Sequence, residues 1–419
     1  MMKRVFFPTL LSMASLSTVA VAADGDRAAA EQWMLRAVES FRQIKTESAI
    51  SHAADKLADA HARLGQVDDA FQAAKRVTNP QLKLYALTAT IQAAVNADQS
   101  TDLMVAEARQ TLKGNEGSFN DVAMKNLLRI AEAKQKTLPA TSKQAELPSL
   151  EQLRKAFDTA VNRREKLVAF QPLMMRSLQT KSFDSLEQAI EETIKVIEQN
   201  PLPDQSSKFG IYGDSAEIAR IRIANLHIAS MLAAEGKSEQ AARQLALADA
   251  VIDPLPDHSA LVKWELQNLR IHVLLKLNRL DEAIQHLNTI KTPLIVSRAA
   301  ADIAAYQIKN GQVEAGLKMA ERIGTGLGSG ENQGTVAIAL FEYADRTIAV
   351  QYINQVGETD EAMNGLISLA RHWVEVSDTA RLQSTFDSIN SPTARTHYAT
   401  SAAVFLALRD VTNADDKAK

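Results

Sequence analysis

The residues with the clearest potential for chemistry form a glycine-rich stretch, GTGLGSGENQG, from Gly324 to Gly334. Successive backbone N–H groups ahead of a helix can hold a phosphate or a carboxylate. Gly326, Gly328 and Gly330 are therefore candidates for a weak anion-binding loop. Their spacing fits neither the phosphate-binding loop of nucleotide hydrolases nor the dinucleotide-binding loop, and no lysine follows them. We favour a flexible joint between two helices.

The other reactive side chains form no recognisable motif. The eight histidines are scattered, and the patterns of zinc proteases, serine hydrolases and EF-hands are all missing. The chain has no cysteine, which excludes disulfides, thiol catalysis, Fe–S clusters and cysteine-based zinc sites. We therefore predict no catalytic residue, no cofactor and no metal site. The alternative is an α-helical hydrolase or lyase whose distant residues converge, with His227, His272 or His286 among them.

The N-terminal segment predicts export. Lys3 and Arg4 precede an uncharged run that ends in the motif AVA at residues 20–22, which is typical of a secretory signal peptide cleaved before Ala23. An uncleaved N-terminal anchor is the alternative. Removing residues 1–22 takes away two of the 47 basic residues, so 45 remain against 50 acidic ones and the net charge is about −5. We expect a periplasmic or secreted protein with no nucleic-acid partner and, after cleavage, no membrane insertion.

The elements that would position functional residues are predicted to be helices, and three prolines indicate where some of them begin. Pro80, Pro293 and Pro392 each follow an Asn, Thr or Ser residue. These residue types are favoured at the N-cap, and proline is favoured at the first helical position because its missing N–H has no partner to lose there. We therefore expect each proline to begin a helix and not to break one.

Alignment on these prolines reveals an internal repeat of 33 residues. Its copies begin at Asn278, Gly311, Ala344 and Ser377, and an earlier copy begins at Gly65. Within each copy, apolar spacings of three and four residues predict a short helix, a capped turn and a longer helix. Three columns, nine, twelve and twenty-six positions after the start, are apolar or small in all four later copies: Leu287, Ala320, Ile353 and Phe386; Ile290, Ile323, Val356 and Ile389; Ala304, Ala337, Ala370 and Ala403.

The segments GQVEAGLKMA and NRLDEAIQHL place a small residue five positions, and an apolar residue nine positions, after a turn residue. This pattern resembles the second helix of tetratricopeptide repeats, which have about 34 residues and a proline after that helix. The resemblance implies an all-α fold, a right-handed α-solenoid of stacked helical hairpins. We divide the chain into a signal peptide (1–22), N-terminal helical repeats (23–140), off-register helices with Pro/Gly/Ser-rich boundary loops (141–214), tetratricopeptide-like hairpins (215–277), 33-residue repeats (278–408) and a disordered tail (409–419).

In such a solenoid, one helix of each pair lines a concave face that can bind a partner. The longer helices carry polar and aromatic residues that are our candidates for this groove: Tyr85, Arg298, Asn332, Asn364, Arg371, His372 and His397. We predict an exported, non-catalytic scaffold or adaptor that binds a protein or peptide partner of the cell envelope there. The alternatives are the enzyme described above and a self-assembling structural element.

Overall fold

The structure, a computed structural model, describes residues 24–113, 148–201, 214–252, 255, 260–324, 328–355 and 360–417. These residues form nineteen α-helices and one short 3-10 helix, and no β-strand occurs among them. The predicted all-α class is confirmed. None of the described helices is both long and apolar enough to span a membrane. The proposed signal peptide and most of the two Pro/Gly/Ser-rich boundary loops, residues 137–150 and 200–215, lie outside the described residues.

The chain divides into two compact units. Unit 1 combines residues 1–140 with residues 350–419, and unit 2 comprises residues 141–349. Residues 278–408, which the sequence groups as one block of repeats, are thus divided between the units. One helix, α17 (Arg346–Gln355), contains the division.

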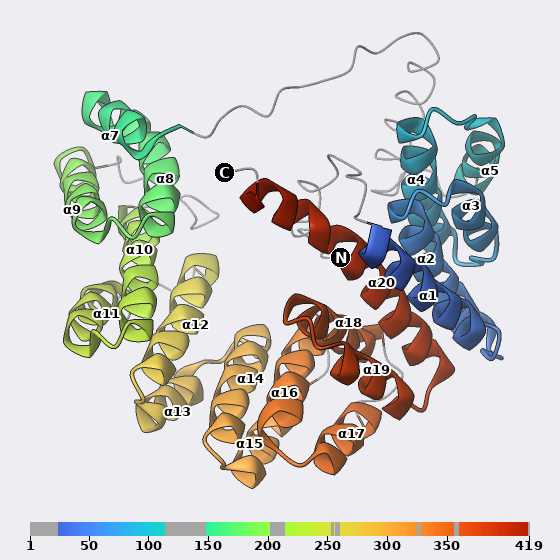
Figure 1. The fold of residues 1–419 in the computed structure, drawn as a ribbon. Coiled ribbons are helices and arrows are strands. Elements are labelled where there is room, and N and C mark those ends of the chain that lie inside the picture. The colour runs from blue at the N-terminus through green and yellow to red at the C-terminus, as the bar shows by residue number, and fades with distance from the viewer. Residues whose placement is uncertain are drawn as a thin grey trace, which may run out of the picture. The chain divides into compact units, whose positions relative to one another are not determined.

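The helices of unit 2 alternate between two rows (Figure 1). In the first row α8, α10, α12, α14 and α16 pack in succession, whereas α9, α11, α13 and α15 each pack mainly against the first-row helix before them. The helices of this first row are the ones whose exposed face is predicted to bind a partner. The elements are α7 (Leu150–Thr159), α8 (Arg163–Gln179), α9 (Phe183–Gln199), α10 (Asp214–Ala234), α11 (Ser238–Ile252), α12 (Ala260–Lys276), α13 (Leu280–Thr289), α14 (Pro293–Lys309), α15 (Val313–Ala320), η2 (Glu321–Ile323) and α16 (Ser329–Tyr343).

Unit 1 joins the two ends of the described chain. Its first row runs α18, α20, α2, α4, so the last helix packs directly against the second one. No second-row helix follows α20 in the described chain. Helix α1 packs along α20 in the position that such a helix would occupy (Figure 1). The elements are α1 (Asp24–Phe41), α2 (Glu47–Arg63), α3 (Val67–Lys75), α4 (Pro80–Asn96), α5 (Asp102–Leu112), α18 (Asp360–Glu375), α19 (Thr379–Ser388) and α20 (Pro392–Lys417).

The contact between α1 and α20 is apolar and well packed. Trp33 of α1 meets the ring of Tyr398 in α20 and that of Phe386 in α19, with centroid separations of 6.1 and 5.5 Å. Ala37 is fully buried, and its carbonyl accepts a hydrogen bond from the Thr396 hydroxyl at 3.5 Å. The buried side chains of α1 recur at helical spacings of three and four residues, so one face of this helix is committed to the contact. The apolar ones are Ala30, Trp33, Met34, Ala37 and Phe41, and Ser40 is buried with them.

Seven turns between paired helices share one backbone geometry. One residue after the first helix adopts a positive φ, and the N–H of the next residue donates to the carbonyl five positions before it. This hydrogen bond closes the helix end and reverses the chain. The seven residues are Gly65, Asp98, Lys181, Gly236, Asn278, Gly311 and Ser377. Four of these are predicted repeat starts, whereas the fifth start, Ala344, has extended backbone.

The helix-start predictions are confirmed at all three prolines. Pro80, Pro293 and Pro392 are the first residues of α4, α14 and α20. The side chain of Asn79 accepts hydrogen bonds from two backbone N–H groups in the first turn of α4, as an N-cap should. The repeat columns are buried as well, apart from the half-buried Phe386 and from Val356, which lies outside the described residues.

Helix α20 continues to Lys417, into the stretch from residue 409 that the sequence predicts as a disordered tail. This last stretch is polar, and the sequence interpretation took polarity to mean disorder. Once a helix has been nucleated, each added residue gains a backbone hydrogen bond at little further cost. A polar extension of a long packed helix therefore needs no apolar contacts of its own.

Gly316 is required by the packing of α15 on α14. A Cβ atom there would lie 2.6 Å from Cγ1 of Ile308 and 2.8 Å from the carbonyl oxygen of Ala304. We expect Gly316→Ala to lower the free energy of unfolding of unit 2 by about 1 to 3 kcal/mol, measured by urea titration with hydrogen exchange. The control is Gly236→Ala, because a Cβ atom at Gly236 would have no atom within 4 Å. This variant should lower the free energy of unfolding by only about 1 kcal/mol, the cost of placing alanine at a positive φ. Equal losses in the two variants would contradict the close contact.

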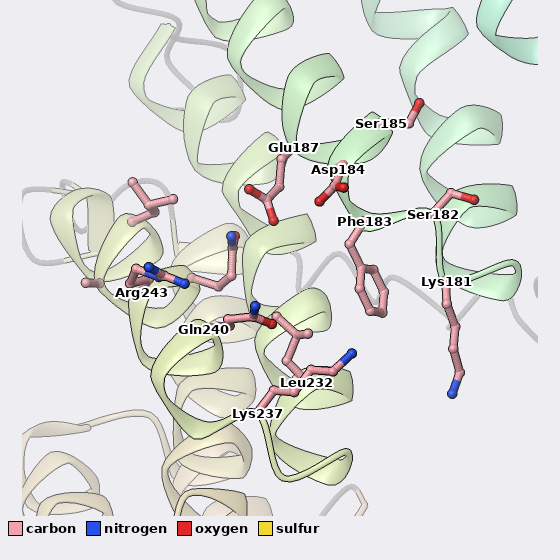
Figure 2. Close-up of a pocket in the computed structure, with 13 residues that line it drawn as sticks. Lys181, Ser182, Phe183, Asp184, Ser185, Glu187, Leu232, Lys237, Gln240 and Arg243 are labelled. Carbon is pink, nitrogen blue, oxygen red and sulfur yellow. The ribbon is translucent and has the colours of Figure 1, made fainter.

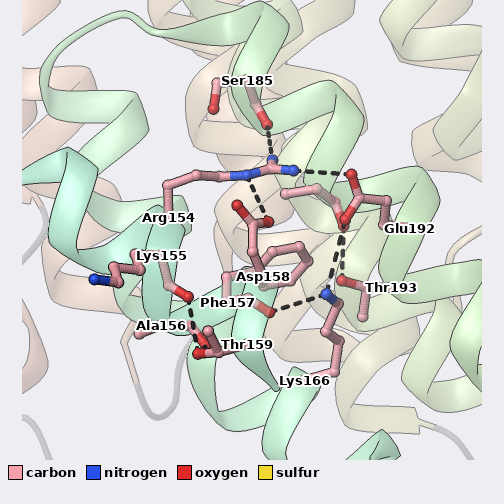
Figure 3. A network of polar contacts seen from close by, with 11 residues as sticks. Arg154, Lys155, Ala156, Phe157, Asp158, Thr159, Lys166, Ser185, Glu192 and Thr193 are labelled. Atoms are coloured by element: carbon pink, nitrogen blue, oxygen red, sulfur yellow. Dashed lines mark hydrogen bonds and ion pairs between the residues drawn. The ribbon is translucent and has the colours of Figure 1, made fainter. Parts of the chain in front are cut away.

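A polar network fixes α7 on α8 and α9 (Figure 3). Arg154 of α7 forms ion pairs with Asp158 at 2.9 Å and with Glu192 of α9 at 2.8 Å. Lys166 of α8 is buried, and its ammonium donates to the carbonyl of Phe157 at 2.9 Å while lying 3.9 Å from the centre of that ring. Because these charges are paired and bonded within the unit, the network positions helices and offers no free group to a ligand.

Candidate functional site

A cleft of about 400 Å³ lies between α12 and α14 on the first row of unit 2. It is lined by side chains of the second half of each helix and of the turns that follow them. Helix α12 and its turn contribute His272, Leu275, Lys276 and Asn278; α14 and its turn contribute Asp302, Ala305, Tyr306, Lys309 and Asn310. Most of these residues are polar or ionisable, which is unusual for a surface between two packed helices.

Helical spacing explains why these groups meet. His272 and Lys276 are four residues apart on α12, and Asp302 and Tyr306 are four apart on α14, so each pair occupies one helix face. The hydroxyl of Tyr306 donates to Oδ1 of Asn278 at 3.0 Å, which ties α14 to the turn after α12. The ammonium of Lys276 donates to the Ser230 hydroxyl of α10 at 2.8 Å. The walls of the cleft are therefore held in place by their own hydrogen bonds.

Asp302 is the most perturbed acid of the cleft. Burial raises the pKa of its carboxyl group to about 6, although the positive charge of Arg298 on the preceding turn acts in the opposite direction. Among the described residues, none donates a hydrogen bond to this carboxylate. An ionised acceptor that is partly buried and lacks a donor is costly, and a ligand that supplies a donor would recover that free energy.

The pKa values of three bases in and near this cleft are lowered, in the direction opposite to that of Asp302. Burial lowers the pKa of His272, and the charges of Lys276 and Arg298 lower it further. Burial also lowers the pKa of His227 on α10 and that of Lys276. At neutral pH the cleft thus combines the neutral imidazole of His272 with an ionised carboxylate and flanking cations. Such clusters of shifted groups in a cleft are typical of functional sites.

We expect Asp302→Asn to stabilise unit 2 at neutral pH. The folded pKa of about 6 lies above the ordinary value of 3.8, so the folded state holds this proton more tightly and loses stability as pH rises from 3.8 to 6. The amide should therefore raise the free energy of unfolding by about 1 to 2 kcal/mol at pH 7.5, allowing for partial solvent exposure, and by nothing near pH 3.5. Urea unfolding at the two pH values measures this, and an equal gain at both would contradict the titration.

The predicted groove residues are distributed over both units. Arg298 is exposed on α14 beside the cleft. Tyr85 of α4 and Asn364 and Arg371 of α18 are exposed in unit 1, where Arg371 pairs with Glu375 at 2.7 Å. His372 is half-buried, with its ring centre 4.8 Å from that of Trp373. The predicted groove residues therefore belong to two separately described units.

Two predicted groove residues require correction, because Asn332 and His397 are buried. The amide of Asn332 donates to the Ser297 hydroxyl of α14 at 2.8 Å, so it links α16 to α14. The ring nitrogens of His397 have no hydrogen-bond partner, and burial lowers the pKa of this group to about 3. Repeat register placed both residues on the longer helices, but register alone does not tell the packed face from the exposed one.

The glycine-rich stretch is only partly described. Gly326 lies outside the described residues. Gly328, with a φ of +82°, precedes α16 as its N-cap, and Gly330 is buried in the first turn of that helix. Gly328 is thus a turn residue and Gly330 a packing residue.

Sequence reasoning named His272 only as one possible histidine and did not single out Asp302, Lys276 or Lys309. The signal at Asp302 was its setting, because it is the one charged residue in the apolar run AAADIAA of a predicted buried stripe. No group of three or more His, Asp or Glu side chains suited to a metal ion occurs within the described ranges. No family model, curated protein or solved structure matches this chain.

Proposed function

We propose that this chain is an exported, non-catalytic adaptor that binds a protein or peptide partner along its first-row helices. In this proposal the helical pairs form an α-solenoid related to tetratricopeptide repeats, and the first row is its concave binding face. The turn geometry shared by seven helical pairs supports a common ancestral hairpin. The N-terminal sequence supports export to the periplasm or the medium, with cleavage before Ala23.

The observation that carries the proposal is the α12–α14 cleft. It offers a carboxylate without a donor, neutral imidazole and two lysines, all on a row of helices whose backbone is already hydrogen-bonded. A peptide could donate to Asp302 and accept from the lysines without disturbing the fold. Exposed Arg298 extends the polar surface towards the start of α14. Polar anchors along a row of packed helices are the usual means by which helical-repeat proteins hold a partner.

Affinity capture with matched variants tests this. Residues 23–419 and the double variant Lys276→Glu/Arg298→Glu would be used to capture proteins from a cell-envelope fraction, with mass spectrometry as the readout. The variant should lose at least nine-tenths of a partner that the parent retains, because both reversed charges face the first row. The control, Lys318→Glu, changes an exposed lysine of the second-row helix α15 and should retain that partner. Equal recovery by all three proteins would refute the proposed face.

The enzyme alternative keeps one supporting observation. His272 does not face solvent alone, since it shares the cleft with Asp302 and interacts electrostatically with His227. A histidine and a carboxylic acid in one cleft are the residue types that general acid–base chemistry uses. We favour the adaptor because no Ser or Thr hydroxyl is among the residues that line this cleft. If capture finds no partner and a small molecule alters the titration of His272, the alternative gains priority.

A further inference from the structure

A second cavity, larger than the α12–α14 cleft, lies on the other row of unit 2. It is a groove of about 970 Å³ between α9 and α11, above the end of α10 (Figure 2). Helices α9 and α11 both pack against α10, and the groove is the space that remains between them. It shares no lining residue with the α12–α14 cleft and is unrelated to the adaptor surface proposed above.

The floor of this groove is apolar. Phe183 begins α9 and is half-buried, and Leu232 of α10 is buried beneath it. On α11, Ala246 is exposed, and Leu247 keeps 39% of its surface accessible. An exposed leucine beside a phenylalanine and an alanine in a concave surface is a favourable place for apolar side chains of a partner.

The two walls carry opposite charges that do not pair with each other. Asp184 and Glu187 stand on the α9 side, and Gln240 and Arg243 stand on the α11 side (Figure 2). No ion pair or hydrogen bond of the side chains of Asp184, Glu187 or Arg243 occurs among the described residues. The groove itself holds the acidic and basic walls apart.

At one end of the groove, in contrast, the charged side chains already form ion pairs with one another. Glu235 pairs with Lys181 at 2.7 Å and with Lys237 at 2.9 Å, and these hydrogen bonds lower the pKa of its carboxyl group to about 2. These lysines therefore close the end of the groove and do not add a general positive charge to it. The free charges are those along its sides, where they would flank an elongated ligand.

A helix suits this groove better than an extended peptide does. All walls are α-helices whose backbone groups are hydrogen-bonded internally, so no strand edge is offered to an extended chain. A helix satisfies its own backbone and brings only side chains to the contact. The volume of the groove equals that of about two turns of a helix roughly 10 Å wide. The lining residues of α11, from Gln240 to Leu247, extend over the same number of turns.

We propose that this groove binds an amphipathic helix of a partner protein. The apolar stripe of that helix packs on Phe183 and Leu247, its basic edge faces Asp184 and Glu187, and its acidic edge faces Arg243. Such a helix completes the charge pairs that the two walls cannot make with each other. Unit 2 then has two separate binding surfaces, one on each row of helices.

Peptide display tests this surface directly. The probe is a library of 15-residue amphipathic helical peptides with a fixed Leu/Ala stripe and with Lys, Glu or Ser varied at both edges, selected against the immobilised chain of residues 23–419. Peptides with one basic and one acidic edge should be enriched. Fluorescence anisotropy should show at least tenfold weaker binding of these peptides to Arg243→Glu and to Leu247→Asp. Circular dichroism and urea unfolding confirm that each variant is folded.

A charge exchange gives the strongest discrimination. The variant Asp184→Lys/Glu187→Lys/Arg243→Glu should reject the selected peptides and bind peptides whose two edges are interchanged. Absence of enrichment, enrichment without a charge pattern, or equal binding to parent and Arg243→Glu would each overturn the proposal. Because the Lys276→Glu/Arg298→Glu variant leaves this groove intact, it should bind the selected peptides like the parent. Failure of the adaptor surface is thereby distinguished from failure of the groove.

Discussion

Replacing Ala37 with aspartate is expected to unfold unit 1 and to leave unit 2 folded. Ala37 is fully buried where α1 packs on α20, so an aspartate side chain at this position would be removed from water. Burying an unpaired charge there should lower the free energy of unfolding of unit 1 by more than about 3 kcal/mol. Hydrogen exchange read by mass spectrometry should show loss of protection in α1, α20 and α2, with unchanged protection in α10, α12 and α14.

The matched control is Leu35→Asp on the same helix. Leu35 is 66% exposed, so the same carboxylate remains in water at that position. Its effect on unfolding should stay within about 0.5 kcal/mol. If Ala37→Asp leaves the protection of α20 unchanged, α1 does not complete unit 1, and the closure of this unit through its two ends is wrong.

The second large effect concerns acid. His397 is buried without a hydrogen-bond partner, and burial, with the nearby charges of Lys56 and His52, lowers its pKa from 6.5 to about 3. The unfolded chain therefore binds this proton at a higher pH than the folded one, and stability falls as pH drops from 6.5 towards 3. Each pH unit below 6.5 lowers the free energy of unfolding by about 1.4 kcal/mol through this group. At pH 5 the loss relative to neutral pH should therefore be about 2 kcal/mol.

His397→Leu should remove this part of the acid sensitivity. At pH 7.5 the variant should be as stable as the parent, since an apolar side chain replaces an imidazole that makes no hydrogen bond. At pH 5 it should be more stable by about 2 kcal/mol, measured by urea unfolding with hydrogen exchange of α20. Unit 2 of the same molecules is the internal control. Parallel loss of stability by parent and variant between pH 7.5 and 5 would refute the role of His397.

Local signals in the sequence were sufficient for several features of the fold. The N-cap and proline pairs placed the starts of α4, α14 and α20 correctly, because both preferences depend only on neighbouring backbone groups. The columns of small and apolar residues identified buried positions such as Ala304 and Ile389. Ala344 was aligned as a turn of the same kind but has extended backbone, since alanine has no preference for a positive φ.

The features that the sequence did not reveal depend on contacts between distant segments. The α12–α14 cleft is lined by Asp302 and His272 from two different helices. No local sequence pattern predicts that these two residues line the same cleft. Asn332 and His397 are polar, so the sequence favoured the surface, but tertiary packing buries both. The packing of α1 against α20 could not be predicted from the sequence for a further reason. Helix α1 lies outside every aligned copy, and its partner stands at the opposite end of the chain.

The pairing of α1 with α20 determines when unit 1 can finish folding during synthesis. The hydrogen bond from Thr396 to Ala37 joins residues 359 positions apart. At about 5 to 20 residues per second, a ribosome makes α20 roughly 20 to 70 s after α1. For that time Trp33 lacks its ring contacts with Phe386 and Tyr398, and Ala37 lacks its hydrogen bond from Thr396. Helix α1 therefore completes its packing only after α20 has been made, and a chain that stops before α20 leaves Trp33 without its contact to Tyr398.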